Sequence, residues 1–329
     1  MGWLTLQFLL CAGLIARAGY VLCECGDRLA GHHGWGRGWV GLALLAAVTS
    51  LPELASGISA VALVDAPNLA VGNALGACVF NLLFLVVVDA LQHRQPIYHR
   101  ASPTHLLSAA FGVVMLAFVA MSLLTGAAAP AVLHVGVYSP GLLVLYLLAL
   151  RSLHAHERAA MAAAVRGVSR IDAQREWRRF AIAALVVVAA GSWLPEVADR
   201  LASALGLTRS FVGTVFMAMV TTLPEMAVTL AALRLGALDL AIGNVLGSNL
   251  FNVTILAVDD AFYTRGPLLA DAAAVHAGTV IAALAMTGLV LVGLVMRPQG
   301  RVLRVTSWIS VGLVAAYLLN AALVFLAAE

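Results

Sequence analysis

The sequence predicts an all-α membrane protein with ten transmembrane helices arranged as two inverted-topology, five-helix repeats. Three observations lead to this fold class. The 329-residue chain is 62% hydrophobic and only 11% charged, it contains ten long apolar runs, and its second half repeats motifs of its first half. Because a soluble domain carries about 25% charged residues, the composition excludes a water-soluble globule.

Each apolar run has the length of about 20 residues that a helix needs to cross a bilayer. Only helices and closed barrels can satisfy every backbone polar group in lipid, and these Leu-, Ala- and Val-rich runs lack the alternation of barrel strands. The predicted spans are 4–22, 38–62, 68–91, 105–125, 130–150, 179–204, 209–233, 238–262, 269–296 and 303–327.

The placement of arginine predicts the orientation of the chain. All 19 basic residues are arginine, and most of them would fall on one side of the membrane. Because cytoplasmic loops carry the excess of basic residues, we expect the long central loop in the cytoplasm and both termini outside it. The arginines of that loop are Arg151, Arg158, Arg166, Arg170, Arg175, Arg178 and Arg179.

Two further consequences follow from the charges. The net charge of +3 is explained by the cytoplasmic loops, so no nucleic-acid partner is expected. A chain without lysine but rich in alanine and arginine is typical of a GC-rich bacterial genome, and this favours the plasma (inner) membrane as its location.

Two halves of the chain share one pattern. "AGYVLCECGDRLA" (18–30) aligns with "AGSWLPEVADRLA" (190–202), and "AVGNALGACVFN" (70–81) aligns with "AIGNVLGSNLFN" (241–252). We therefore predict a first repeat over 1–150, an Arg-rich linker over 151–178 and a second repeat over 179–329. An odd number of spans in each copy inverts the second one, and inverted repeats are typical of secondary transporters.

A proline and a glutamate occur at matching points of both halves, in "TSLPE" (49–53) and "TTLPE" (221–225). Pro52 and Pro224 cannot donate to the preceding turn, so each helix should kink and expose carbonyl oxygens. The hydroxyls and carboxylates beside them form a set of hard oxygens, which suits Ca²⁺ or Na⁺ rather than Zn²⁺ or Cu⁺. The side chains in this set are Thr49, Ser50, Glu53, Thr221, Thr222 and Glu225.

An alternative explanation is a kinked helix whose glutamate is protonated or bonded to a neighbouring helix. Two copies in register, each followed by a Gly-Asn helix, make this explanation much weaker.

The Gly-Asn helices present a second polar face in each half. Asn73, Ala77 and Asn81 are spaced by four residues and share one helix face, as do Asn244, Ser248 and Asn252. This face could supply amide and hydroxyl oxygens. Small-residue packing with interhelical hydrogen bonds is the alternative, above all for the glycines Gly72, Gly76, Gly243 and Gly247.

These paired motifs resemble the two α-repeats of the cation/Ca²⁺ exchanger superfamily, most closely its prokaryotic sodium/calcium exchanger branch. The motifs lie at 46–81 and 218–252, and the ten-span layout extends the resemblance over nearly the whole chain. The resemblance implies Glu53 and Glu225 as central cation ligands. It implies assisting ligands at Thr49, Ser50, Thr221, Thr222 and Ser248, backbone carbonyls near Ala46 and Ala218, and the amides of Asn81 and Asn252.

The sequence departs from the family pattern at several positions. Val48 and Val220 stand where the family favours glycine, so we expect stiffer bends than the family pattern gives. Ala77 lacks the hydroxyl that Ser248 keeps, which puts one Na⁺ ligand in doubt and opens the possibility of H⁺ as the counter-ion. Asn252 replaces the aspartate of K⁺-dependent exchangers, which argues against coupling to K⁺.

The remaining chemistry-bearing residues have competing explanations. Glu24 and Glu196 either line an ion path or pair with arginines near the membrane surface. Asp89 and Asp260 end their helices and are expected to be interfacial rather than ligands. The remaining cluster, Cys23 and Cys25 with His32 and His33, matches no standard metal-site spacing.

The sequence therefore predicts a secondary antiporter that exchanges Ca²⁺ for Na⁺ by alternating access. Its partners would be the transported ions and the bilayer, with no cofactor and no obligatory protein partner. A Ca²⁺/H⁺ exchanger is the alternative, and a channel or a non-transporting cation-binding protein is a weaker one. No motif of an enzyme is present in the sequence.

Overall fold

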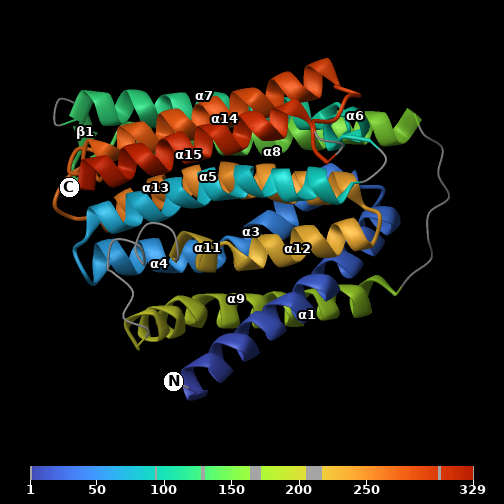
Figure 1. Ribbon diagram of the computed structural model, residues 1–329, viewed down its shortest axis with the longest axis horizontal. Coiled ribbons are helices and arrows are strands. Elements are labelled where there is room, and N and C mark those ends of the chain that lie inside the picture. The colour runs from blue at the N-terminus through green and yellow to red at the C-terminus, as the bar shows by residue number, and fades with distance from the viewer. Residues whose placement is uncertain are drawn as a thin grey trace. The chain divides into compact units, whose positions relative to one another are not determined.

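The computed structural model describes residues 2–92, 95–126, 130–163, 172–204, 217–302 and 305–328. Apart from one short hairpin and an isolated bridge, its regular structure is helical (Figure 1). The hairpin pairs β1 (Ala131–Val132) with β2 (Val135–Gly136). The helical elements of the first half are α1 (Gly2–His33), α2 (Arg37–Val40), η1 (Gly41–Leu45), α3 (Ala46–Thr49), α4 (Leu51–Ala62), α5 (Pro67–Leu91), α6 (Ile97–Arg100), α7 (Thr104–Thr125) and α8 (Tyr138–Ala163). Those of the second half are α9 (Ala173–Ala204), α11 (Met217–Thr221), α12 (Leu223–Arg234), α13 (Leu238–Phe262), α14 (Val275–Met296) and α15 (Trp308–Ala328).

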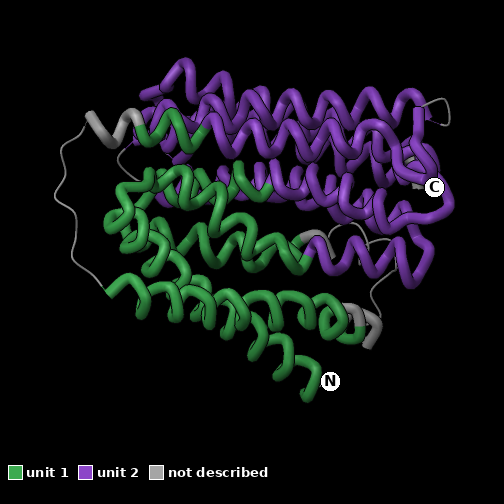
Figure 2. Tube along the Cα trace, turned by 180° about the vertical axis from the view of Figure 1, so that it is seen from behind, with its two compact units in different colours: residues 1–52, 153–248 green, residues 53–152, 249–329 purple. Residues whose placement is uncertain are grey.

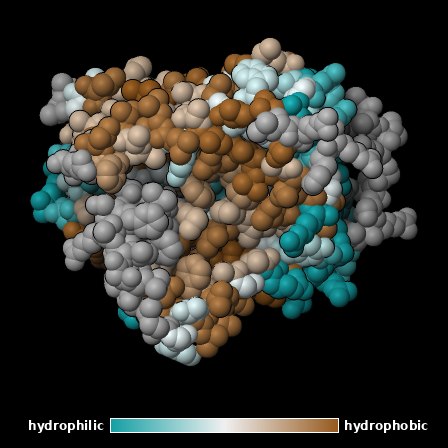
Figure 3. Space-filling model, viewed as in Figure 1, coloured by the Kyte–Doolittle hydropathy of each residue, from teal (hydrophilic) through white to brown (hydrophobic). Residues whose placement is uncertain are grey.

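The helices are those of an integral membrane protein. In the described part of the chain, 7 helices are long and apolar enough to cross a membrane, or 8 if the bent pair Arg37–Thr49 and Leu51–Ala62 forms one span. Large apolar side chains also face outward, including Leu185 and Leu318, and apolar residues cover much of the face drawn in Figure 3. The predicted all-α membrane class is thereby confirmed, whereas the count of ten spans and the inverted topology stay predictions.

Two compact units divide the chain (Figure 2). Unit 1 comprises Met1–Pro52 with Leu153–Ser248, and unit 2 comprises Glu53–Ser152 with Asn249–Glu329. Each unit therefore takes a segment from both halves of the sequence. The predicted linker is partly helical, since α8 extends to Ala163 and α9 begins at Ala173, while 164–171 lie outside the described residues.

Unit 1 is built on α1, which packs against α9 and α12. Leu22 and Leu29 of α1 are fully buried, and they share one hydrophobic core with Val187 of α9 and Val228 of α12. Gly19 permits this approach, because a Cβ atom there would lie 3.2 Å from Cγ2 of Val228. Small residues at such contacts are the usual means of helix association in membranes.

Unit 2 is built on α14, which packs against α5, α7 and α15. The contact between α7 and α14 includes Gly112, whose missing side chain leaves room for the methyl group of Thr287. The core residues Met115, Leu116 and Met286 are buried at this contact.

Two buried aspartates fix the ends of long helices in unit 2. Asp89, near the end of α5, accepts hydrogen bonds from the backbone N–H groups of Ile97 and Ser307 at 2.9 and 2.7 Å. The hydroxyls of Thr306 and Ser310 also donate to it, at 2.7 and 2.8 Å. Asp89 is therefore an internal anchor for the segment that leads into α15.

Asp260, near the end of α13, makes the equivalent contacts. It accepts from the backbone N–H groups of Leu268 and Gly136 at 2.6 and 2.8 Å, and from the hydroxyls of Ser139 and Tyr138 at 2.5 and 2.6 Å. Leu268, Gly136 and Ser139 correspond through the repeat to Ile97, Ser307 and Ser310. The two halves thus repeat in structure as well as in sequence.

These anchors explain where three helices begin later than the sequence predicted. The spans predicted from 130, 269 and 303 start instead at Tyr138, Val275 and Trp308. Gly136 and Ser307, just before α8 and α15, give a backbone N–H to Asp260 and Asp89, and Leu268, in the segment between α13 and α14, gives one to Asp260. A carboxylate that accepts several N–H bonds competes with helix formation for those donors.

Replacing Asp260 by asparagine should destabilise the fold. A hydrogen bond to a charged group contributes about 1.5–3 kcal/mol, so D260N should lower the free energy of unfolding by about 3 kcal/mol and reduce the thermal midpoint in detergent. D65N is the matched control, because Asp65 forms a partly exposed ion pair with Arg265 and asparagine accepts its positive φ of 59°. An equal loss in both variants would contradict the anchoring role of Asp260.

Candidate functional site

The two Leu-Pro-Glu motifs each interrupt a helix at one residue. Ser50 (φ −91°, ψ 4°) separates α3 from α4, and Thr222 (φ −85°, ψ 4°) separates α11 from α12. Pro52 and Pro224 then lie in the first turn of the new helix, where a missing N–H leaves no intrahelical bond unmade. The predicted kinks are therefore full helix breaks with the same geometry in both halves.

Each break gives the glutamate a favourable position. Glu53 and Glu225 lie in the first turns of α4 and α12, where the helix dipole favours negative charge. The carbonyl ends of α3 and α11 come just before them and favour a cation. A half-helix N-terminus and carbonyl end at one break is the arrangement by which membrane transporters form ion sites.

In unit 1, four predicted ligands form two contacting pairs. The Ser50 hydroxyl donates to Oε1 of Glu225 at 2.9 Å, and the hydroxyls of Thr49 and Ser248 are 3.4 Å apart. Thr49 also donates to the carbonyl of Ala46 at 3.2 Å. Because these side chains are at most 1% exposed, they form an oxygen-rich cluster without access to bulk water.

One oxygen of this cluster has no hydrogen bond. Oε2 of Glu225 is buried, and none of the residues that the structure describes donates to it. A carboxylate oxygen in this situation is costly unless a proton or a cation neutralises it. The donor set, carboxylate with hydroxyls and carbonyl oxygen, fits Ca²⁺ or Na⁺.

The other predicted residues of unit 1 lie on α11 and its break. Thr221 and Thr222 are 4% and 0% exposed, and Thr222 donates to the carbonyl of Met219 at 3.3 Å. Ala218 lies in α11, with its side chain outside the described residues.

Unit 2 holds the remaining three predicted ligands. Glu53, Asn81 and Asn252 are at most 1% exposed. Both amide atoms of Asn252 and Nδ2 of Asn81 are buried without a hydrogen-bond partner among residues of the described ranges. Ala77, on the same face of α5 as Asn81, is fully buried and adds no oxygen.

Asn73 and Asn244 have a different role from the neighbouring polar residues. The Asn73 amide donates to the backbone carbonyl of Glu53 at 3.5 Å, and the Asn244 amide donates to that of Glu225 at 3.3 Å. Asn244 also donates to the hydroxyl of Thr229 at 3.1 Å. The alternative of an interhelical hydrogen bond thus accounts for both asparagines, each holding the helix that carries a glutamate.

The prediction of close packing at the glycines is correct for the second repeat and wrong for Gly76. A Cβ atom on Gly247 would lie 2.5 Å from Cα and the carbonyl oxygen of Leu42 and 2.8 Å from Cβ of Ala46. Gly243 contacts Gly38 in the same way, whereas Gly76 has no such neighbour within 4 Å and Gly72 has only the ring of His276. The difference lies in the neighbours, because Gly247 faces Leu42 of η1 and Ala46 of α3, whereas no described atom faces Gly76.

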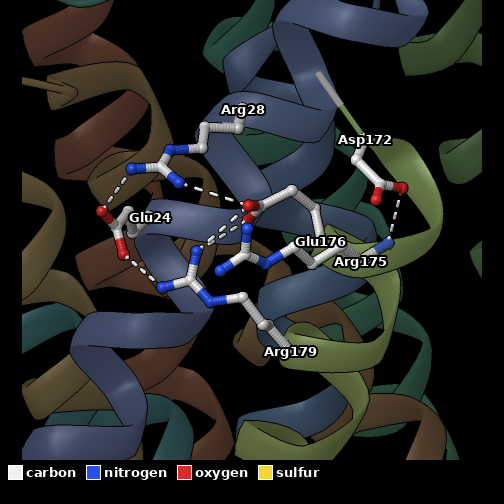
Figure 4. Close-up of polar contacts among 6 residues, drawn as sticks. All are labelled: Glu24, Arg28, Asp172, Arg175, Glu176 and Arg179. Atoms are coloured by element: carbon white, nitrogen blue, oxygen red, sulfur yellow. Dashed lines mark hydrogen bonds and ion pairs between the residues drawn. The ribbon is translucent and has the colours of Figure 1, made fainter.

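Glu24 and Glu196 pair with arginines, which favours the second of their two explanations. Figure 4 shows Glu24 between Arg28 at 2.6 Å and Arg179 at 2.9 Å. Glu176 bonds the same two arginines at 3.2 and 3.1 Å. This four-charge network joins α1 to α9, and Glu196 pairs with Arg200 at 2.5 Å within α9.

The cysteines likewise have structural roles. Cys23 donates its thiol to the carbonyl of Val228 at 3.0 Å, and Cys25 is fully buried in the same core. Both cysteines therefore contribute to the packing of α1 in unit 1.

Sequence analysis missed two residues close to the motifs. Gly191 of α9 faces both prolines, since a Cβ atom there would lie 2.8 Å from Cγ of Pro52 and 3.3 Å from Cγ of Pro224. Asp259 is fully buried in α13. An acidic residue inside the predicted span 238–262 was the available signal, but the repeat comparison pointed to Asp260 beside it.

Broken membrane helices with paired glutamates, hydroxyls and carbonyl ends define a class of protein, the secondary ion transporters, rather than an enzyme. The comparisons with known proteins identify the family. The chain belongs to the sodium/calcium exchanger family, whose model, described as "Sodium/calcium exchanger protein", matches residues 3–151 and 177–326.

Individual relatives have low sequence identity to this chain, but the matches extend over most of its length. The chain is 27% identical over 243 residues to the inner membrane protein YrbG of Escherichia coli (strain K12), covering 70% of each chain. It is 28% identical over 281 residues to the putative antiporter CaxA of Alkalimonas amylolytica, covering 81% of this chain and 82% of that protein. A solved structure of the sodium-calcium exchanger NCX_Mj, soaked with 2.5 mM Na⁺ and 0.1 mM Ca²⁺, matches with a TM-score of 0.76 at 20% identity, covering 97% and 98% of the two chains.

Gly191→Ala should strain the packing of α9 against both helix breaks. Overpacking costs about 1–3 kcal/mol, so the thermal midpoint in detergent should fall. The matched control is Gly288→Ala in α14, where no atom lies within 4 Å of the added Cβ. That change should raise the midpoint, since alanine favours a helix by about 0.5–1 kcal/mol over glycine. If G191A were as stable as G288A, the proposed contact with the prolines would be wrong.

Proposed function

We propose that this protein is a secondary antiporter that exchanges Ca²⁺ for Na⁺ across the plasma membrane by alternating access. The observation that supports this most directly is the pair of helix breaks, each placing a buried glutamate in the first turn of a new helix beside hydroxyl and carbonyl oxygens. Family membership supports the same class of transport. The cytoplasmic position of the central loop and the external position of both termini belong to this proposal.

In this mechanism, Glu53 and Glu225 bind either one Ca²⁺ or the competing monovalent ions. Two carboxylates balance the charge of one divalent cation, and hydroxyl, amide and carbonyl oxygens complete its shell. Thr49, Ser50, Thr221, Thr222, Ser248, Asn81 and Asn252, with the carbonyls of Ala46 and Ala218, are the proposed assisting ligands. Neutralised carboxylates cross hydrocarbon at far lower cost than charged ones, which makes occupancy a condition for movement of the helices.

Proton coupling is a second candidate, and Ala77 is the observation that favours it. Ala77 is fully buried on the face of α5 that carries Asn81, and the repeat places the hydroxyl of Ser248 at the matching point of the other half. Without that oxygen, one monovalent site is weaker for Na⁺.

Removing the charge of either glutamate should abolish exchange. The loss of one partner of a buried ionic contact costs about 3–5 kcal/mol, so E53Q and E225Q should reduce Ca²⁺ uptake about 100-fold or more. The assay is uptake of radioactive Ca²⁺ into liposomes that hold the purified protein and an internal Na⁺ load. E196Q is the control, because Glu196 pairs with Arg200 at the exposed surface of α9. Unchanged uptake in E225Q would refute the proposed site.

Restoring the missing hydroxyl should strengthen Na⁺ binding. A hydrogen bond or ligand contact of about 0.5–1.5 kcal/mol would raise the apparent Na⁺ affinity of A77S roughly threefold to tenfold, measured as the Na⁺ dependence of Ca²⁺ uptake. Ala283→Ser, at a fully buried alanine of α14, controls for the effect of a hydroxyl in the core. The same Na⁺ dependence in A77S and wild type would mean that Ala77 does not face a Na⁺ site.

A further inference from the structure

Asp259 is a carboxyl group that none of the roles described above accounts for. It is fully buried in α13, and neither of its carboxylate oxygens has a hydrogen-bond partner in the described part of the chain. Its neighbour Asp260 is saturated by donors. Of two adjacent carboxyl groups on the same helix, Asp260 is therefore fully hydrogen-bonded, and Asp259 has no hydrogen bond among the residues described.

The carboxyl group of Asp259 lies directly against α4. A Cβ atom on Gly57 would lie 2.7 Å from Oδ1 of Asp259 and 2.8 Å from Cγ, so the carboxyl group occupies the space that a side chain at Gly57 would fill. Gly57 follows Glu53 by four residues, which is about 6 Å along the helix axis and on the same face. Asp259 therefore packs one helical turn from the position of a proposed cation ligand.

The fold does not require an acid at this position. Through the repeat that pairs Asp89 with Asp260, the counterpart of Asp259 is Val88, which is fully buried in α5. An ionised carboxylate with no partner is costly in a membrane-buried position, by several kcal/mol. A neutral, protonated carboxyl group at Asp259 removes that cost.

Among the described residues, no titratable group donates a hydrogen bond to Asp259. In the described part of the chain, Asp259 packs against Gly57 of α4, and its neighbour Asp260 bonds the β-hairpin, the start of α8 and the segment after Phe262. Their titratable and charged groups are Glu53, Asp65, His134, Tyr138, Asp260, Tyr263, Arg265 and Asp271.

Most of these groups are already engaged. Arg265 pairs with Asp65, the His134 ring bonds the carbonyl of Ala261 at 3.1 Å, and Tyr138 donates to Asp260. Burial and the hydrogen bond to Asp271 raise the pKa of Tyr263 to about 12, so it keeps its proton at neutral pH. The positive charge nearest in sequence, on Arg265, is thus paired with Asp65, and Glu53 lies one turn from Gly57 on α4.

We propose that Asp259 is a proton-binding site of the exchange cycle. Its carboxyl group carries a proton while Glu53 holds no divalent cation, and it releases that proton to water when Ca²⁺ binds one turn away. The proton is then transported in the direction opposite to Ca²⁺ and is a counter-ion in addition to Na⁺. It takes the place of the one Na⁺ whose hydroxyl ligand is missing at Ala77. This inference rests on the proposed exchange function, which it deepens by naming a second counter-ion and the residue that holds it.

The protonation of Asp259 can be measured without transport. Infrared difference spectra of the purified full-length protein, recorded without and with Ca²⁺, should contain a carboxylic-acid C=O band that disappears when Ca²⁺ is added. Part of this band should be absent in D259N and in D259V, and it should be intact in the control D65N. Identical bands in wild type and D259N would overturn the proposal.

Transport measurements test the role of the proton in the cycle. In liposomes loaded with Na⁺ and a pH-sensitive dye, Ca²⁺ uptake by the wild type should be accompanied by a rise in luminal pH. D259N and D259V should keep Na⁺-driven Ca²⁺ uptake and lose the pH change. Luminal alkalinisation that persists in both variants would overturn the proposal.

Failure of the proton-binding role of Asp259 and failure of the exchange function, on which this inference rests, give different results in these experiments. D259V copies the first repeat and removes an unpartnered buried acid, so its thermal midpoint should be no lower than that of wild type. A wild-type protein that takes up no Ca²⁺ under either a Na⁺ or a pH gradient would refute the exchange function, and the infrared experiment would still decide the protonation of Asp259.

Discussion

A carboxylate inside a bilayer must be neutralised or fully bonded, and this constraint governs the arrangement of the protein. Asp89 and Asp260 meet it with four donors each, which makes them part of the framework. Glu225 meets it only in part, through the hydroxyl of Ser50, and Asp259 does not meet it at all among the residues described. The number of hydrogen bonds that each carboxylate accepts thus distinguishes the acids that support the fold from those that are available to bind an ion.

The helix breaks are the device that brings acids to membrane depth at an acceptable cost. A proline in the first turn of α4 or α12 leaves no unmade intrahelical bond, and the new helix start favours the glutamate that follows. Asn73 and Asn244 then hold the two broken helices through the carbonyls of those same glutamates. The polar residues around each motif therefore divide into those that support the helix and those that can bind a cation.

The helical segments and both motifs could be predicted from the sequence, because apolar length and proline placement are local properties. The starts of α8 and α15 could not, since Gly136 and Ser307 before them donate to aspartates in distant parts of the chain. The start of α14 follows a local bond from Leu268 to Asp260, which no sequence pattern revealed. Gly76 was indistinguishable in sequence from Gly247, and only the close η1 backbone gives the latter its packing role. Asp259 escaped notice because repeat comparison reveals matched residues, whereas this residue stands alone against Val88.

The reciprocal bonding of the two anchors has a consequence for the order in which the protein can be completed during synthesis. Gly136, Tyr138 and Ser139 precede Asp260 by up to 124 positions, and its remaining donor, Leu268, follows it by only 8, so the partners of Asp260 are complete soon after it leaves the ribosome. Asp89 must wait for Thr306 and Ser307, 217 and 218 positions later. The end of α5 therefore lacks Thr306, Ser307 and Ser310 as partners until the segment before α15 has been translated, and a nascent chain truncated there would hold a buried carboxylate bonded only to the N–H of Ile97.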